Sequence, residues 1–164
     1  MKSSKTSKRG EIFFFGEYEH SVDSQRRVAI PKNWREKGED SRFVLLRGHD
    51  AIQLIPSEAF RDIFEKLKKV SFANKEASRA LAQLGSQGQE CECDSQGRIS
   101  ISPRLMEYAG IKDQVVLVGA LSTGQIWAKE KWDRERGSDE NLLDIIQKIT
   151  ERPDDLADIL KGRI

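Results

Sequence analysis

The sequence predicts an α+β protein, rich in β-strands, in which two copies of one unit are joined by helices. The stretch DSQRRVAIP at residues 23–31 recurs 71 residues further along as DSQGRISISP at residues 94–103. Around both stretches apolar and polar residues alternate, as in half-buried strands, whereas apolar residues at helical spacing occupy residues 57–86. A repeat of this period indicates two supersecondary units that share a core, because neither unit alone can bury its apolar face.

The match between the copies continues beyond the repeated stretch. Residues 44–48 align with 115–119 at the same spacing, and after one inserted residue 54–60 align with 126–132. Each copy therefore predicts the order strand, turn, strand, short helix, strand, strand. The resulting division of the chain is a flexible basic tail (1–12), a first repeat (13–60), a helical linker (57–86), a second repeat (87–132) and a C-terminal helical tail (133–164).

The first copy begins with two strands that are joined by a turn. Within residues 17–22 every second side chain is suited to burial, which indicates a strand with one inward face. Residues 24–26 form the turn, and Val28 and Ile30 resume the inward face.

A short helix and two further strands complete this copy. Pro31 fits the first helical position, and Gly38 fits the end of the helix, which contains Trp34. Strands are expected at residues 42–46 and 51–55.

The linker predicts two amphipathic helices. Ser57 is the expected N-cap of the first, and Asn74 is the expected N-cap of the second, which ends before Gly85. The apolar stripe of the first helix comprises Ala59, Phe60, Ile63, Phe64 and Leu67, and that of the second comprises Ala77, Ala80, Leu81 and Leu84.

The second copy repeats the plan of the first. Ser102 and Pro103 suit the N-cap and first turn of a helix that ends at Gly110, and strands follow at 115–118 and 125–128. After Trp132 two C-terminal helices are expected, a shorter one that starts at Pro153 and, before it, one whose apolar stripe is Leu142, Leu143, Ile146 and Ile149. These stripes must dock on the protein's own body or on a neighbouring subunit.

Composition limits the class of protein. Hydrophobic residues make up 37% and charged residues 34% of the chain, as in a soluble globular protein. No stretch approaches the roughly 18 apolar residues of a membrane span, and the basic N-terminus lacks the apolar segment of a signal peptide. We therefore expect a cytoplasmic protein. The formal net charge is only +1, so any binding of nucleic acid must use a local basic patch.

Cys91 and Cys93 are the only cysteines of the chain. As alternate residues of a strand they point the same way, which disfavours a disulfide between them. Their counterparts in the first copy are His20 and Val22, so the cysteines are best interpreted as small, core-facing side chains. A metal or redox pair is the alternative, but no further cysteine or nearby histidine completes a zinc site. We expect no metal and no cofactor.

The spacing Asp-x-x-x-Arg in each repeat has a simple function at a turn. The carboxylate can accept backbone N–H bonds, and an arginine across the turn can pair with it and be held in a fixed direction. Asp23 with Arg27, and Asp94 with Arg98, would then be only exposed ion pairs, which contribute about 0–1 kcal/mol. A two-fold relation between the copies would also place Arg27 and Arg98 side by side, and oriented guanidinium groups suit guanine edges and phosphates.

Three segments, residues 16–31, 90–99 and 107–110, resemble the MraZ family of bacterial transcriptional regulators. This family is built from two SpoVT/AbrB-like swapped-hairpin units and is encoded at the head of the division and cell-wall gene cluster. The resemblance covers about residues 13–132. It implies one pseudo-two-fold swapped-hairpin barrel made from both copies and a closed ring of subunits. It also implies binding of double-stranded DNA at short tandem promoter repeats, usually as a repressor of the protein's own operon, in the nucleoid.

The resemblance assigns DNA contacts to Arg27 and Arg98, and Arg26 is a further DNA-binding candidate beside them. The residues expected to shape the two turns are Asp23, Asp94 and Gly97. Secondary candidates for DNA contact are Gln25, Lys32, Gln96 and Arg104.

The first turn departs from the family pattern. Most members have lysine where this chain has Gln25 and glycine where it has Arg26, whereas the second turn keeps Gly97. Arg26 must either avoid a positive φ or adopt one at a cost of the order of 1 kcal/mol. Ser102 also replaces the first of two prolines that commonly end the second motif.

Two other classes of function are alternatives to DNA binding. An enzyme is disfavoured, because the two histidines, His20 and His49, lie in no recognised catalytic spacing and the chain has no Gly-rich phosphate loop or nucleophile elbow. We therefore expect no catalytic residue and no small-molecule substrate. A ring-forming scaffold that recruits a partner through its C-terminal helices is compatible with the sequence and is kept as the alternative.

Overall fold

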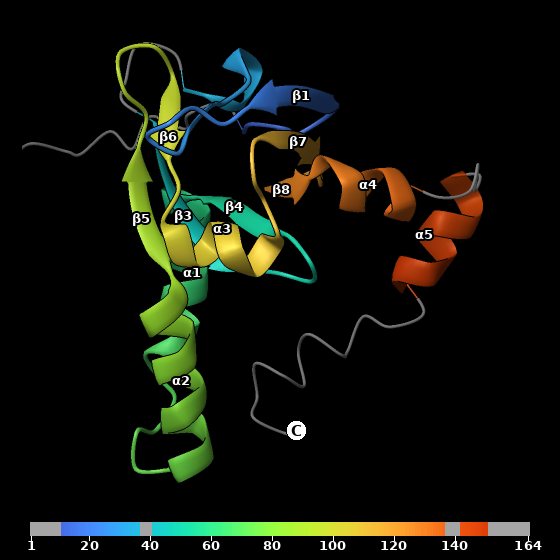
Figure 1. The fold of residues 1–164 in the computed structure, drawn as a ribbon. Helices are drawn as coiled ribbons and strands as arrows, with labels where there is room; N and C mark the ends of the chain where they lie inside the picture. The colour runs from blue at the N-terminus through green and yellow to red at the C-terminus, as the bar shows by residue number, and fades with distance from the viewer. Residues whose placement is uncertain (1–10, 37–40, 137–141, 151–164) are drawn as a thin grey trace, which may run out of the picture.

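A computed structural model describes residues 11–36, 41–136 and 142–150 of the chain (Figure 1). The strands of the first copy are β1 (Glu17–Ser21), β2 (Arg27–Ala29), β3 (Arg42–Arg47) and β4 (Ile52–Pro56). Those of the second copy are β5 (Gln89–Glu92), β6 (Arg98–Ser100), β7 (Gln114–Gly119) and β8 (Gly124–Ala128). The predicted β-rich α+β fold with two tandem units is confirmed.

The strands of the two copies are interleaved. A six-stranded antiparallel sheet has the order β1-β7-β8-β4-β3-β5, and β2 pairs with β6 in a separate two-stranded sheet. The first strand of each copy therefore pairs with the third strand of the other copy, β1 with β7 and β5 with β3. Within the described residues the strands form these two sheets.

The register of the strands corrects the alignment of the copies. Phe43 lies opposite Cys91, and Val115 lies opposite His20, so Phe43 corresponds to Val115 at a spacing of 72 residues. The inserted residue thus precedes β7, whereas the sequence alignment placed it after Gly119. Both third strands are apolar over several consecutive residues, which is why sequence alone permitted a slip by one position.

One core is shared by both copies. Val28 and Ile99, which face each other across the β2–β6 pair, are each 1% exposed and pack in the same cluster as the central strands. Cys93 belongs to this cluster and Cys91 packs against it, as predicted for small, core-facing side chains. Burial, together with neighbouring Cys93, raises the pKa of the Cys91 thiol to about 12. Ile12 also packs on the core.

The helices confirm some predicted ends and correct others. Their bounds are η1, a 3-10 turn (Lys32–Trp34), α1 (Ser57–Leu67), α2 (Lys75–Gln87), α3 (Pro103–Ala109), α4 (Lys129–Glu135) and α5 (Leu142–Thr150). The expected end of the first short helix at Gly38 and the helix at Pro153 lie outside the described residues.

Asn74 caps α2 by accepting a hydrogen bond from the backbone N–H of Ala77 at 3.1 Å, as predicted. Ser102 caps α3 in the same way, and Gly110 ends α3 with φ of 67°. Two other predicted ends are wrong.

Ser57 is not an N-cap, because α1 begins with it and Pro56 holds the cap position. The extended backbone of a strand that ends at Pro56 leads straight into the helix, so no polar cap residue intervenes. Helix α2 continues through Gly85 to Gln87, because an isolated glycine lowers helix stability without ending a helix.

Two helical features shape the outside of the protein. Helices α1 and α2 extend away from the sheets as a projecting arm and have no buried residue (Figure 1). Helix α4, which the sequence did not predict, packs Trp132 on Trp127 of β8 with ring centroids 5.3 Å apart.

None of the helices in the described part of the chain has both the length and the apolar character that crossing a membrane requires.

Two glycines give a test of the packing. A Cβ added at Gly119 would lie 2.7 Å from the Cα of Phe15 and still closer to the backbone of Phe14, so Gly119→Ala should lower the free energy of unfolding by about 1–3 kcal/mol. The control Gly85→Ala lies in a helix with nothing within 4 Å, and should raise it by about 0.5–1 kcal/mol. Denaturant unfolding of both variants measures this difference. Equal stability of the two variants would contradict the packing described.

Candidate nucleic-acid interface

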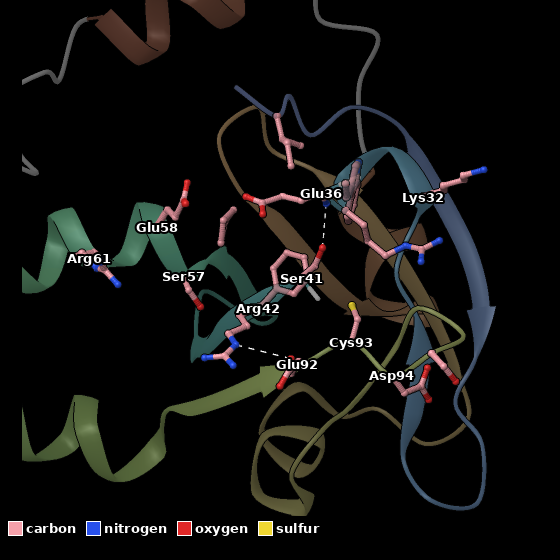
Figure 2. Close-up of a pocket in the computed structure, with 16 residues that line it drawn as sticks. Lys32, Glu36, Ser41, Arg42, Ser57, Glu58, Arg61, Glu92, Cys93 and Asp94 are labelled. Carbon is pink, nitrogen blue, oxygen red and sulfur yellow. Dashed lines mark hydrogen bonds and ion pairs between the residues drawn. The ribbon is translucent and has the colours of Figure 1, made fainter. Parts of the chain in front are cut away.

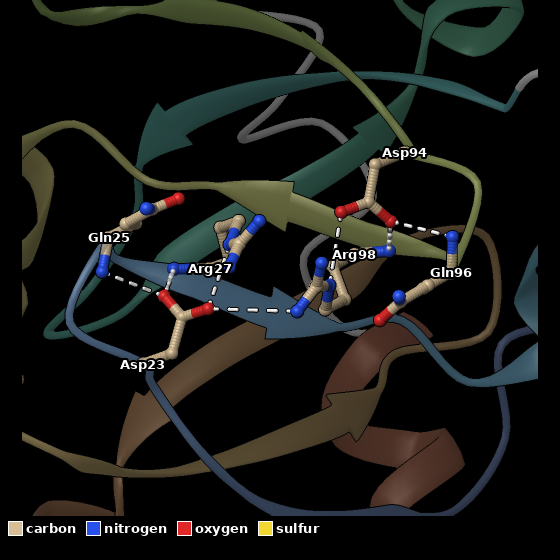
Figure 3. Close-up of polar contacts among 6 residues, drawn as sticks. All are labelled: Asp23, Gln25, Arg27, Asp94, Gln96 and Arg98. Carbon is tan, nitrogen blue, oxygen red and sulfur yellow. Dashed lines mark hydrogen bonds and ion pairs between the residues drawn. The ribbon is translucent and has the colours of Figure 1, made fainter.

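Two turns with the same hydrogen bonds connect β1 to β2 and β5 to β6 (Figure 3). In the first, the Asp23 carboxylate accepts the backbone N–H groups of Gln25 at 2.9 Å and Arg27 at 2.8 Å. In the second, Asp94 accepts those of Gln96 at 2.9 Å and Arg98 at 3.0 Å. Each aspartate thus closes its own turn, and the glutamines lie exposed at the tips.

The second oxygen of each aspartate orients an arginine. Arg27 Nε donates to Asp23 Oδ2 at 2.7 Å, and Arg98 Nε donates to Asp94 Oδ2 at 3.0 Å. The pKa of each carboxyl lies below its usual value, first because the backbone N–H of the arginine donates to it and further because the arginine side chain does. Both guanidinium groups are therefore held in fixed directions while remaining partly exposed.

The β2–β6 pair brings the two turns together. Arg27 lies opposite Ser100 and Ala29 lies opposite Arg98. Backbone bonds of 2.9 Å extend the ladder at both ends, from Ile30 N–H to the Gly97 carbonyl and from Ile101 N–H to the Arg26 carbonyl.

Arg98 also reaches the other turn. Its Nη1 lies 3.8 Å from Asp23 Oδ2, the atom that Arg27 contacts. The structure therefore places Arg27 and Arg98 side by side, as expected from a two-fold relation between the copies.

Arg26 is where the two turns differ. It has φ of 58°, in the left-handed region, and its counterpart Gly97 has φ of 75°. The first turn thus holds an arginine in a backbone conformation that is unfavourable for residues other than glycine. The side chain is not directed freely to solvent, because Arg26 Nε donates to the Ile101 carbonyl at 3.1 Å.

The remaining predicted residues lie at the margin of this site. Lys32 is exposed in η1 and Arg104 is exposed in the first turn of α3. Neither takes part in the hydrogen bonds that hold the two turns. Sequence reasoning assigned no individual role to Arg35, whose guanidinium packs against Gly97. The only signal was that its counterpart in the second copy, Met106, is apolar.

A pocket of about 980 Å³ lies behind the second turn (Figure 2). Its walls come from η1, the start of β3, the start of α1 and residues 93–95. Four cations and four carboxylates line it: Lys32, Arg35, Arg42, Arg61, Glu36, Glu58, Glu92 and Asp94. Because these charges balance, the pocket has no excess positive charge to attract a phosphate backbone.

The two histidines lie apart from this site, His20 half-buried in β1 and His49 exposed in the loop before β4. In the described ranges, no three side chains among histidine, cysteine, aspartate and glutamate gather as ligands for a metal ion.

The arrangement of two interleaved copies agrees with comparisons to known proteins. A family model described as "MraZ protein, putative antitoxin-like" matches residues 13–83 and 86–145. The chain belongs to the MraZ family. The two matched segments each contain one Asp-Ser-Gln turn, so the MraZ family model recognises both copies.

Relatives support this membership over most of their length. A Clostridium tetani protein named "Transcriptional regulator MraZ" is 37% identical over 139 residues, which are 84% of this chain and 97% of the relative. Its namesake from Caldicellulosiruptor saccharolyticus is 37% identical over 144 residues, 87% of this chain and 97% of the relative. Another, from Clostridium beijerinckii, is 35% identical over 139 residues, with coverage of 84% and 97%.

The lowered carboxyl pKa values predict how acid affects this MraZ protein. A carboxyl whose folded pKa lies below the ordinary value of 3.8 contributes stability above that value, and loses it as pH falls through the folded pKa. The double variant Asp23→Asn, Asp94→Asn should therefore depend less on pH below about pH 4 than the natural protein does. Thermal unfolding from pH 2 to 6 measures this, with Asp113→Asn as the control. An unchanged pH dependence in the double variant would contradict the assignment.

Proposed function

We propose that this protein regulates transcription by binding double-stranded DNA through the paired turns, with Arg27 and Arg98 contacting bases. The observation that carries this proposal is the pair of oriented guanidinium groups, whose side chains are 31% and 27% exposed. A guanidinium held in a fixed direction can bond the O6 and N7 atoms of guanine, the commonest specific contact in the major groove. The name "Transcriptional regulator MraZ" that the relatives carry supports the same function.

The fold fits this function as a swapped-hairpin barrel. In that interpretation the hairpins β1–β2 and β5–β6 are exchanged between the copies, so that the two-stranded sheet presents both turns on one surface. This interpretation is supported by the pairing of each first strand with the other copy, β1 with β7 and β5 with β3. Gln25 and Gln96 at the tips, then Lys32 and Arg104, are secondary contacts in this proposal.

Self-assembly would compensate for the weak DNA binding expected of a single protomer, which offers few cations. With a net charge of +1, one protomer neutralises few phosphates and should bind weakly. The exposed apolar side chains include two groups that lie apart, Phe64 and Phe72 on the arm and Phe13 and Phe15 near the N-terminus. Two different faces in contact between subunits generate a ring when the rotation closes.

A closed ring that engages tandem repeats in the promoter of its own operon, as a repressor, is therefore our proposal. It implies a cytoplasmic protein that associates with the nucleoid.

A scaffold function is the second candidate. Helix α5 exposes an apolar stripe with Leu143 77% and Ile149 65% exposed, which suits recruitment of a partner. Retention of the protein on its own upstream DNA, compared with scrambled DNA of equal length, separates the two functions. A scaffold without DNA-binding activity would show no preference.

Removal of one guanidinium tests the proposed base contacts. Arg27→Ala and Arg98→Ala should each weaken binding to the protein's own upstream DNA by about 1–3 kcal/mol and relax the sequence preference at a subset of base pairs. The control Arg79→Ala removes an exposed cation from α2 and should leave binding unchanged. Electrophoretic shift titrations at one salt concentration measure the effect. Unchanged binding by Arg27→Ala would refute the assignment.

The number of DNA repeats tests the role of assembly. Several correctly phased repeats should bind about 10² to 10⁴ times more tightly than one repeat, because later contacts in a ring become intramolecular. Repeats whose spacing is shifted by half a helical turn serve as the control and should lose most of this gain. Mass measurement on the same sample reports the oligomer. Equal affinity for one repeat and for four would contradict the ring proposal.

A further inference from the structure

Arg35 is an energetically unfavourable residue at its position, because it buries a polar group. It directly follows η1, and its Nε is buried without a hydrogen-bond partner in the described part of the structure. Its counterpart 71 residues later is Met106, which is 9% exposed. Methionine fills such a place without burying a polar group, whereas an unpaired guanidinium N–H loses its bonds to water. A buried polar group without a partner calls for an explanation, and the contacts of the Arg35 guanidinium provide one.

The guanidinium packs directly against the second turn. A Cβ added at Gly97 would lie 3.0 Å from Arg35 Nε and closer still to the terminal atoms of that side chain. Arg35 thus occupies the space beside the one turn residue that has no side chain of its own. Gly97 lies between Asp94 and Arg98, so Arg35 supports the backbone that carries the second oriented arginine.

Two more contacts join side chains of the first copy to the second copy. Arg26 Nε donates to the Ile101 carbonyl at 3.1 Å, and Asp23 Oδ2 lies 3.8 Å from Arg98 Nη1. The contacts made by Arg26 and Arg35 have no equivalent in the opposite direction. The counterpart of Arg26 is Gly97, which lacks a side chain, and the counterpart of Arg35 is Met106, which lacks an N–H donor.

We propose that Arg35 is a positioning residue for Arg98. Side chains of the first copy then hold the turn of the second copy more rigidly than the turn of the first copy is held. Arg98 then selects its bases more stringently than Arg27, which makes the two halves of the reading surface unequal. This inference rests on the proposed DNA-binding function of the turns, but the positioning itself can be measured without DNA.

The first experiment is hydrogen exchange of the full chain without DNA. Arg35→Met introduces the residue of the second copy and should accelerate amide exchange in peptides that cover residues 94–99 by about tenfold, because local opening becomes easier. Peptides that cover residues 23–28 serve as the internal control and should not change. Lys32→Met, from the same helical turn, should change neither. Unchanged exchange at 94–99 in folded Arg35→Met, or equal acceleration at both turns, would overturn the proposal.

Arg35→Lys keeps the positive charge without the planar group. It should accelerate exchange at residues 94–99 by about threefold, less than methionine does, if the guanidinium supports the turn by packing. This variant also decides the question if Arg35→Met does not fold. Exchange as slow as in the natural protein would show that the guanidinium is not required.

The second experiment uses competition between DNA duplexes that differ at single base pairs. Arg98→Ala identifies the base pairs whose discrimination depends on Arg98, and Arg27→Ala identifies the other set. Arg35→Met should lower discrimination by about three- to tenfold at the first set alone, and should add nothing to Arg98→Ala in the double variant. A uniform loss at both sets would indicate a general structural role and overturn the proposal. If the natural protein shows no base preference, the proposed function fails, while hydrogen exchange still decides the positioning.

Discussion

The pairing of β2 with β6 is the constraint on which the rest of the structure depends. It comprises only three residue pairs, yet it joins segments from different copies and buries Val28 against Ile99 in the core. Because the turns lie at the ends of these strands, the same pairing brings their aspartates and arginines together. The interleaved six-stranded sheet joins the same two copies again, through the pairing of β1 with β7 and of β5 with β3.

The electrostatics of the site follow from this proximity. Each aspartate uses one oxygen for backbone N–H groups and the other for an arginine, so turn geometry and arginine direction are set by one side chain. The carboxylates also cancel much of the positive charge that would attract DNA over a distance. Affinity in the proposed function therefore depends on geometry and on repeated engagement rather than on net charge.

Local signals in the sequence predicted most of the helices and strands, but they could not predict the contacts between the copies. The alternation of β1, the cap at Asn74 and the glycine ending α3 are determined by neighbours a few residues away. The bond from Arg26 to Ile101 joins residues 75 apart, and the support of Gly97 by Arg35 also crosses between copies. The position of the inserted residue depends on strand pairing, which apolar stretches leave ambiguous.

The central claim is that the surface carrying both turn tips faces DNA. Photo-crosslinking tests it most directly, with a photoreactive amino acid in place of Gln25, Gln96 or Phe72 in the full-length protein bound to its own upstream DNA. Our account predicts protein–DNA adducts from positions 25 and 96 and none from position 72, which lies on the projecting arm with its side chain 86% exposed. Adducts from position 72 without adducts from 25 and 96 would contradict it.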